Sequence, residues 1–256
     1  MEKLKNSISE PVPGACPSAL PRYRKGTMHR AVPSLIIAGL LVSGGVVSCG
    51  TPDETSSPDT SASASASPSA EATVPADQMD RLVPADARTI ADPADPQATL
   101  VLFTDYQCPY CAMMDTLIQQ AKADYGDQVR IVVRNYPLPK HQNAEPSARA
   151  VEAAAEQGAM EAMATTVFEH QQDWKGASNV DEIFSQYAQD LGLDMDQFRA
   201  DYSSGAVKER VARDLQDAQD LEVRGTPTLY LDGTAVQLET GAYSEISEPL
   251  DNTLKN

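Results

Sequence analysis

Two cysteines separated by two residues lie where a predicted buried strand passes into a predicted helix. Residues 100–103 (LVLF) form a short continuous apolar run, as expected of a central strand that is covered on both faces. Residues 109–124 have a helical pattern, so Cys108 and Cys111 fall at the start of that helix. Residues i and i+3 at a helix start face one another, and their sulfurs can close into a disulfide with little backbone movement. The fold must therefore lead a central strand directly into a helix that presents a cysteine pair.

The position of Cys108 favours a reactive thiolate. Backbone N–H groups at a helix start have no partner within the helix, and the positive end of the helix dipole lies there. Such placements lower a thiol pKa from about 8.5 to about 3.5–7.5. Cys111 lies one turn further and suits the resolving role, and Pro109 is tolerated in a first turn because the donor it lacks has no partner there. The motif predicts thiol–disulfide exchange, with Tyr110 modulating the chemistry rather than performing it.

Three other interpretations of the cysteine pair are open. A zinc site needs two further ligands, and the soft candidates after Cys49, His141 and His170, are not in paired spacing. A structural disulfide gains little by closing so short a loop. Copper(I) delivery would use Met113 and Met114 as additional soft ligands, but both methionines are expected to pack on the inner face of the helix. We therefore predict no metal and no cofactor besides the redox-active disulfide.

The chain after this helix continues in an α/β order. Residues 129–133 (VRIVV) are β-branched and predict a second strand, parallel to the first and reached by a right-handed crossover. A helical block follows, with Gly158 as a break, because apolar residues recur at helical spacing. Its helices are expected over 148–155, 160–167, 180–191, 195–202 and 205–222.

The C-terminal part has a hairpin signal. Residues 228–231 and 234–238 are apolar-rich runs that flank the dipeptide Asp232-Gly233. Such a dipeptide between two strands favours a two-residue turn, so we predict a β-hairpin. An amphipathic stretch over about 244–254 predicts a final helix.

The N-terminal part is a predicted export signal. Residues 22–30 are basic and residues 31–47 are apolar with small residues, which is typical of a secretory signal. The four residues that end at Cys49 (VVSC) resemble the lipobox of bacterial lipoproteins, in which the cysteine is acylated and becomes the mature N-terminus. A plain signal peptide or a signal-anchor with an incidental cysteine is the alternative. Met28 is a more ordinary start for such a signal than Met1.

Composition distinguishes the segment over 49–78 from the domain that follows it. Residues 49–78 are rich in Ser, Ala, Thr and Pro and cannot bury enough apolar surface to fold, so we expect a disordered tether. After residue 49 the chain carries 14 basic and 35 acidic side chains. Such a body is repelled by phosphate backbones, which argues against a nucleic-acid partner.

Three segments resemble the DsbA family of thioredoxin-fold thiol–disulfide oxidoreductases. Residues 103–111 (FTDYQCPYC) are similar to the family's active-site motif. Residues 129–158 are similar to its second strand and the entry to its inserted helical domain, and residues 223–233 (VRGTPTLYLDG) are similar to its cis-proline loop. The resemblance covers about 79–256 and implies a thioredoxin-like α/β fold with a helical insertion at about 143–222.

The resemblance also implies roles for individual residues. Pro227 would be cis and lie beside the cysteines, and Thr226 would offer backbone hydrogen bonds to a bound peptide by strand addition. Some thioredoxin-fold enzymes bury a carboxylate beneath the cysteines. Asp105 precedes Cys108 by three residues, and acidic caps near helix starts are common, so a helix cap and a proton-transfer role both stay open for it. Four further residues are expected to pack or to be solvated, with the lining of a substrate groove as the alternative: Arg134, Tyr136, His141 and Trp174.

The predicted organisation has three parts: an extension and signal peptide over 1–48, the tether over 49–78 and the catalytic domain over 79–256. We predict an extracytoplasmic oxidoreductase, lipid-anchored to the cell membrane through Cys49, or secreted if that cysteine is not acylated. Its partners would be reduced or misfolded secreted proteins and a membrane redox partner that reoxidises the cysteines. An oxidising compartment favours disulfide donation. An isomerase or reductase with the same site, and a non-catalytic binding lipoprotein on a thioredoxin scaffold, are the alternatives.

Overall fold

The computed structural model describes residues 72–255. The predictions for the signal segment 1–48, for acylation of Cys49 and for the tether up to residue 71 lie outside the described residues. Among residues 72–255, no helix is both long enough and apolar enough to cross a membrane.

The folded part begins before the predicted boundary at residue 79. Residues 72–78, at the end of the predicted tether, lie against the sheet: Thr73 forms an antiparallel bridge with Thr234, and Val74 is buried. Two backbone hydrogen bonds join the start of this segment to the hairpin, from Val74 N–H to Gly233 at 2.8 Å and from Ala235 N–H to Ala72 at 2.9 Å, and composition alone does not reveal such pairing.

The strands of the described region form one five-stranded sheet, in the order β1-β3-β2-β4-β5. The bounds are β1 (Arg88–Ala91), β2 (Ala98–Thr104), β3 (Val129–Asn135), β4 (Thr228–Leu231) and β5 (Thr234–Val236). β2 and β3 are parallel, which confirms the predicted crossover pair, whereas the other neighbours are antiparallel. β1 was not predicted, because it is a four-residue edge strand in which only Ile90 is buried.

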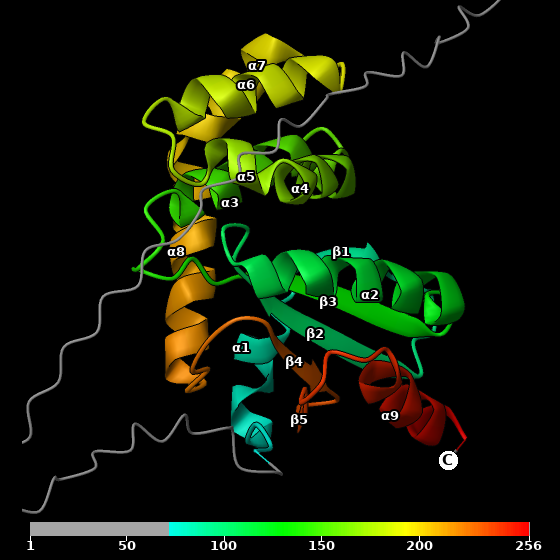
Figure 1. Ribbon diagram of the computed structural model, residues 1–256. Helices are drawn as coiled ribbons and strands as arrows, with labels where there is room; N and C mark the ends of the chain where they lie inside the picture. The colour runs from blue at the N-terminus through cyan, green and yellow to red at the C-terminus, as the bar shows by residue number, and fades with distance from the viewer. Residues whose placement is uncertain (1–71, 256) are drawn as a thin grey trace, which may run out of the picture. The chain divides into compact units, whose positions relative to one another are not determined.

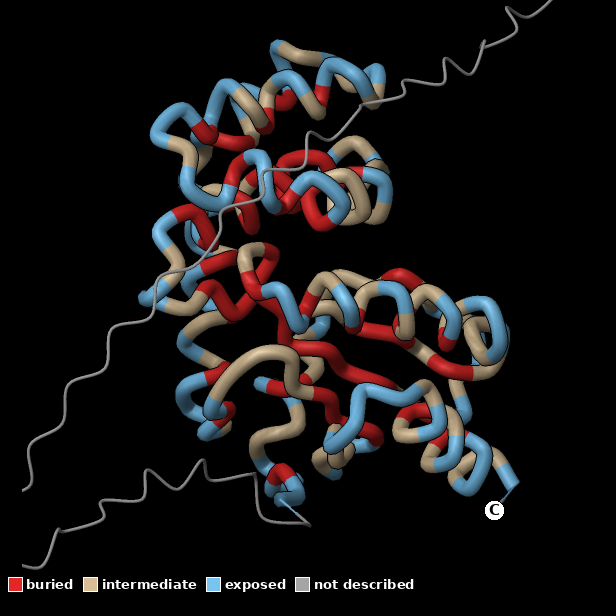
Figure 2. Tube along the Cα trace, in the orientation of Figure 1, coloured by how far each residue is buried: buried red, intermediate tan, exposed pale blue. Residues whose placement is uncertain are grey.

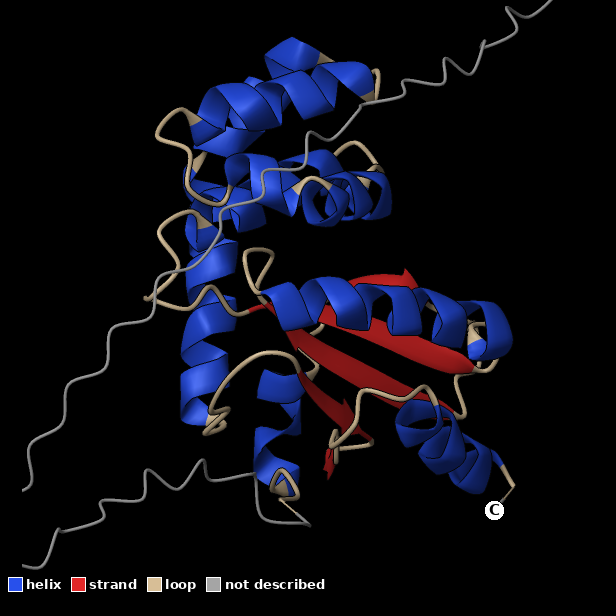
Figure 3. Ribbon diagram, viewed as in Figure 1, coloured by secondary structure: helices blue, strands red, loops and turns tan. Residues whose placement is uncertain are grey.

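The helices agree closely with the apolar spacing of the sequence (Figures 1 and 3). Their bounds are α1 (Met79–Leu82), α2 (Pro109–Tyr125), α3 (Ala144–Ala155), α4 (Met160–Glu169), α5 (Gln171–Trp174), α6 (Val180–Asp190), α7 (Met195–Ser203), α8 (Gly205–Asp220) and α9 (Ser244–Leu254), with a 3-10 turn, η1, over Ala76–Gln78. The four-residue helices α1 and α5 escaped prediction because one turn shows no periodicity. The helical insertion implied by the resemblance is present as α3 to α8.

Two turns have the backbone conformations that their residues predict. Asp232 and Gly233 both have positive φ angles, 47° and 83°, as a two-residue hairpin turn between β4 and β5 requires. Gly158, between α3 and α4, has a φ of 72°, which a residue with a side chain rarely adopts. The predicted hairpin and the predicted break in the helical block are therefore confirmed.

Alternation along β2 divides the core between the two faces of the sheet. Leu100 and Leu102 pack in one apolar cluster with residues of α2 and α9, whereas Val101 and Phe103 pack in another with residues of α1 and α8. Figure 2 shows the central strands as largely buried. The continuous apolar run of β2 is thus explained by helices on both faces.

The helical insertion has a core of its own, and the cysteines belong to it. Cys108 and Cys111 lie in one apolar cluster with buried residues of α3 to α8, including Val151 and Phe184. Figure 1 shows α3 to α7 stacked beyond α2, and α8 returning alongside the sheet. The active-site end of α2 therefore lies between the sheet and the insertion.

Candidate active site

The cysteine pair occupies the first turn of α2, as predicted. Cys108 is the N-cap residue, with φ −76° and ψ 124°, and Pro109 follows at the first helical position. Both cysteines are free thiols in this structure. Cys108 is 4% exposed and Cys111 is fully buried, which fits an attacking and a resolving cysteine, respectively.

Hydrogen bonds make Cys108 strongly acidic. A hydrogen bond from the Cys111 thiol, together with the Cys111 N–H, the Thr226 side chain and the Tyr110 N–H, outweighs burial and lowers the pKa of Cys108 to about 5. These N–H groups lie in the first turn of α2, where the sequence predicted donors to the Cys108 sulfur. At neutral pH, Cys108 is therefore a thiolate, the form that acts as a nucleophile.

Cys111 behaves in the opposite way. Burial raises the pKa of Cys111 well above its ordinary value, and the neighbouring Cys108 adds to this effect. Two donors oppose the rise: the backbone N–H of Asp105, which lies 3.5 Å from the Cys111 sulfur, and the side chain of Thr226. The pair thus consists of one ionised and one protonated sulfur, and in coupled groups such a split stabilises a single negative charge.

The cis-proline loop lies against the attacking cysteine. The Thr226–Pro227 peptide bond is cis, which confirms the prediction for Pro227. The Cys108 sulfur lies 3.5 Å from the carbonyl oxygen of Thr226. The loop is held from β3 by Tyr136, whose hydroxyl donates to the carbonyl of Val223 at 2.9 Å. The contact of Thr226 and Pro227 with a bound peptide stays a prediction.

A groove of about 1190 Å³ borders the same loop. Its walls include Thr226 and Pro227, the segment 72–75 that precedes η1, and residues 235–239 at the end of β5. Neither cysteine lines this groove.

Asp105 holds the turn between β2 and α2 rather than capping the helix. Its carboxylate is buried and accepts hydrogen bonds from the backbone N–H groups of Gln107 (2.8 Å) and Leu138 (2.9 Å). The third partner is the Nδ1 atom of His141, at 2.6 Å. Sequence reasoning missed this contact because the two residues are 36 positions apart. A signal was available: they follow β2 and β3, whose carboxyl ends meet at one edge of the sheet because the strands are parallel.

The helical insertion fixes the same turn from its other side. Gln171 donates to the carbonyl of Tyr106 at 2.8 Å. The side chain of Gln107 accepts from the N–H of Asn143 at 2.7 Å and donates to the carbonyl of Lys175 at 2.9 Å. The turn that presents Cys108 is therefore preorganised by both parts of the domain.

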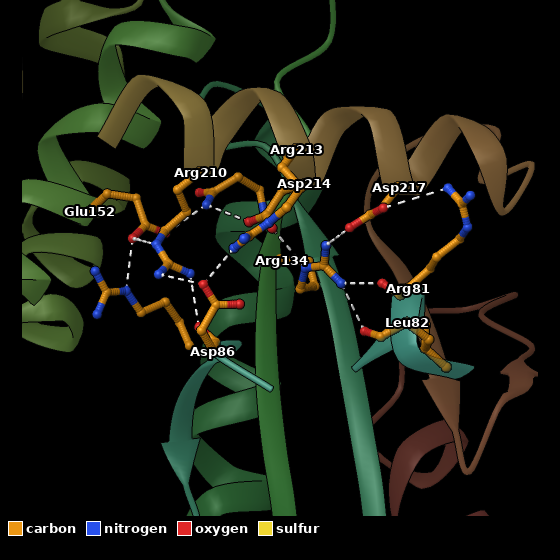
Figure 4. Close-up of polar contacts among 11 residues, drawn as sticks. Arg81, Leu82, Asp86, Arg134, Glu152, Arg210, Arg213, Asp214 and Asp217 are labelled. Carbon is orange, nitrogen blue, oxygen red and sulfur yellow. Dashed lines mark hydrogen bonds and ion pairs between the residues drawn. The ribbon is translucent and has the colours of Figure 1, made fainter. Parts of the chain in front are cut away.

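A buried ion-pair network fastens α8 to the sheet (Figure 4). Arg134 on β3 pairs with Asp214 at 2.9 Å and with Asp217 at 2.7 Å, and it also donates to the carbonyl of Leu82 at 2.9 Å. Beside it, Glu152 accepts from Arg88 at 2.8 Å, and burial raises the pKa of Glu152. Because α8 leads into the cis-proline loop, this network also positions that loop.

The other residues singled out in the sequence lie partly in the core and partly at the surface. Arg134, Tyr136 and Trp174 are buried and pack, as expected, and His141 contacts Asp105. Tyr110 is 65% exposed on the first turn of α2.

The expectation for the two methionines is half wrong. Met114 is buried against the sheet, but Met113 is 61% exposed. Neighbouring helical positions differ by about 100° around the axis, so one narrow apolar face cannot hold both.

Comparisons with known proteins agree with this geometry. A family model described as thioredoxin, Thioredoxin_4, matches residues 92–252. The Na⁺/H⁺ antiporter NhaA of Herminiimonas arsenicoxydans is 40% identical over 144 residues, which are 56% of this chain and 22% of the antiporter. The chain thus spans less than a quarter of the length of the curated relatives it matches.

Solved structures share the fold. A thioredoxin-like oxidoreductase from Silicibacter pomeroyi is 27% identical with a TM-score of 0.55, over 69% of this chain and 98% of that one. The thiol-disulfide exchange protein alpha-DsbA2 from Wolbachia pipientis is 19% identical with a TM-score of 0.59, over 69% and 91%. A periplasmic thioredoxin-like protein from Salmonella enterica serovar Typhimurium is 22% identical with a TM-score of 0.52, over 72% and 99%. The chain therefore belongs to the thioredoxin family and has the DsbA-like form of its fold, with a helical insertion and a CPYC cysteine pair at the start of α2.

Proposed function

We propose that the protein is a DsbA-like thiol–disulfide oxidoreductase that donates its Cys108–Cys111 disulfide to reduced proteins. The observation that supports this most is the pKa of about 5 for Cys108, beside a buried partner and a cis-proline loop. An inert structural disulfide needs no such split in acidity between its two sulfurs.

Disulfide donation proceeds in two exchanges. A substrate thiolate attacks the Cys108 sulfur; the Cys108–Cys111 bond breaks, and Cys111 leaves and takes up a proton because its pKa is raised. A second substrate thiolate then attacks the substrate sulfur of the mixed disulfide, and Cys108 leaves as a thiolate. The substrate gains a disulfide, and the two electrons stay on the cysteine pair. The second exchange is favoured because a thiol of low pKa is a good leaving group.

The acidity of Cys108 also supports the direction. At pH 7 a thiol of pKa 5 is ionised, whereas one of pKa 9 is not, and this difference stabilises the reduced form by about 3 kcal/mol. A stabilised reduced form makes the disulfide a stronger oxidant. We therefore propose disulfide donation as the activity, in preference to reduction or isomerisation.

We propose that the enzyme acts outside the cytoplasm on reduced or misfolded secreted proteins, and that a membrane redox partner reoxidises it. The export signal and the lipobox-like residues up to Cys49 support this location. The fold shared with a periplasmic protein, and the similarity to a segment of a membrane antiporter, are consistent with it. Anchoring at the membrane surface would use acyl chains on Cys49.

Oxidative refolding tests the proposal. The oxidised protein, added in stoichiometric amounts to a reduced secreted protein without another oxidant, is expected to generate substrate disulfides while its own cysteines become reduced. Thiol counting on both proteins measures the transfer. Faster recovery of activity from a scrambled, already oxidised substrate than from a reduced one would assign isomerisation instead, and unchanged thiol counts would refute the exchange activity.

A further inference from the structure

Both cysteines contact the main chain of one residue, Asp105. The N–H of Cys108 donates to the carbonyl of Asp105 at 3.0 Å, and the N–H of Asp105 points at the Cys111 sulfur at 3.5 Å. The orientation of this one residue therefore decides whether a backbone donor is available to the resolving sulfur.

The side chain of Asp105 fixes that orientation. Its carboxylate has no exposed surface, and three donors hold it: Gln107 N–H, Leu138 N–H and His141 Nδ1. A buried carboxylate is costly without its full set of hydrogen bonds, so each donor restrains the turn. His141 is the one side chain among these three donors, and it is 18% exposed.

We propose that Asp105 and His141 are a positioning pair that serves the resolving cysteine. The pair holds the Asp105 N–H at the Cys111 sulfur, where this donor stabilises the thiolate that Cys111 must become in order to attack. Burial works against that thiolate, and two donors oppose burial: this N–H, which has the larger effect, and the side chain of Thr226. This inference rests on the proposed exchange function.

The step concerned is the closure of the disulfide. When Cys108 carries a mixed disulfide with a partner thiol, Cys111 loses its proton to solvent and attacks the Cys108 sulfur. The Cys108–Cys111 bond forms, the bond from Cys108 to the partner breaks, and the partner leaves as a thiolate. Loss of the positioning pair should slow this closure and leave the first attack by Cys108 unchanged, since the donors to the Cys108 sulfur come from the first turn of α2 and from Thr226, not from Asp105 or His141.

Reaction of the reduced protein with 5,5′-dithiobis(2-nitrobenzoate) separates the two events. Cys108 attacks the reagent and releases one nitrothiobenzoate; Cys111 then attacks the mixed disulfide and releases the second. In His141→Leu we expect the second phase to slow about tenfold at neutral pH, with its pH profile moved to higher pH by about one unit. The first phase should keep its rate.

Rescue and control variants define the outcome. His141→Asn places an N–H donor near the position of Nδ1 and should restore the second phase. Asp105→Asn, which presents an amide to the same donors, should slow it. His170→Leu is the control, because His170 and Asp173 form an exposed pair in which Nδ1 and the carboxylate oxygen lie 3.3 Å apart. This variant should change neither phase.

The results discriminate clearly. A second phase of normal rate in His141→Leu and Asp105→Asn, or an equal slowing of both phases, would overturn the positioning role. If His141→Leu does not fold, the rates of the second phase in Asp105→Asn and His141→Asn still test the positioning role. A wild-type protein that reacts in one phase only, without closing a disulfide, would instead refute the proposed function.

Discussion

Replacing Cys108 with serine is expected to reduce substrate oxidation to the rate measured without the protein. Cys108 supplies the acidic sulfur of the pair, and serine forms neither a disulfide nor a thiolate. The measurement is oxidative refolding of a reduced secreted protein, followed by thiol counting, with a glutathione buffer to regenerate the disulfide.

Cys111→Ser is the matched variant, because it keeps the acidic sulfur and removes the resolving one. It is expected to lose net oxidation but to accumulate a mixed disulfide through Cys108, visible as a covalent adduct on a non-reducing gel. Circular dichroism checks that both variants fold. Oxidation at the wild-type rate by Cys108→Ser would contradict the assigned chemistry.

Removing the charge of Arg134 is expected to destabilise the protein by about 3–5 kcal/mol. The Arg134 side chain is 1% exposed, and Arg134→Met leaves Asp214 buried without its cation. For a domain of this size the melting temperature should fall by roughly 10 °C. Chemical denaturation of the reduced protein at neutral pH measures the change in the free energy of unfolding.

Arg130→Met is the control on the same strand. Arg130 pairs with Asp92, but both side chains are well exposed, at 36% and 50%. Exposed pairs contribute about 0–1 kcal/mol, so this variant should unfold close to the wild type. Equal effects of the two substitutions would show that the network around Arg134 does not fasten α8 to the sheet.

The sequence predicted the parts of the fold that local patterns encode. The apolar run of β2, the β-branched β3, the Asp232-Gly233 turn and the amphipathic helices each carry a periodicity or a turn residue. The edge strand β1 and the one-turn helices carry neither. The cysteine pair was found because its chemistry depends on residues three apart in one helix turn.

Contacts between distant segments could not be predicted in the same way. Arg134 was expected at the surface or in general packing, because its partners Asp214 and Asp217 lie 80 and 83 residues away. His141 reaches Asp105 through the parallel arrangement of β2 and β3. The folding of residues 72–78 depends on pairing with β5, which their composition does not suggest.

The ionisation of Cys108 tests the account most directly. Thiolate absorbance of the reduced wild-type protein, followed as a function of pH and compared with the oxidised protein, isolates the signal of the cysteine pair. Because the folded site stabilises the ionised form, absorbance should be lost only as the pH falls through about 5. A single thiol titrating near 5, with Cys111 still protonated at neutral pH, is the predicted result. A midpoint for Cys108 near its ordinary value of 9.0 would contradict the proposed chemistry.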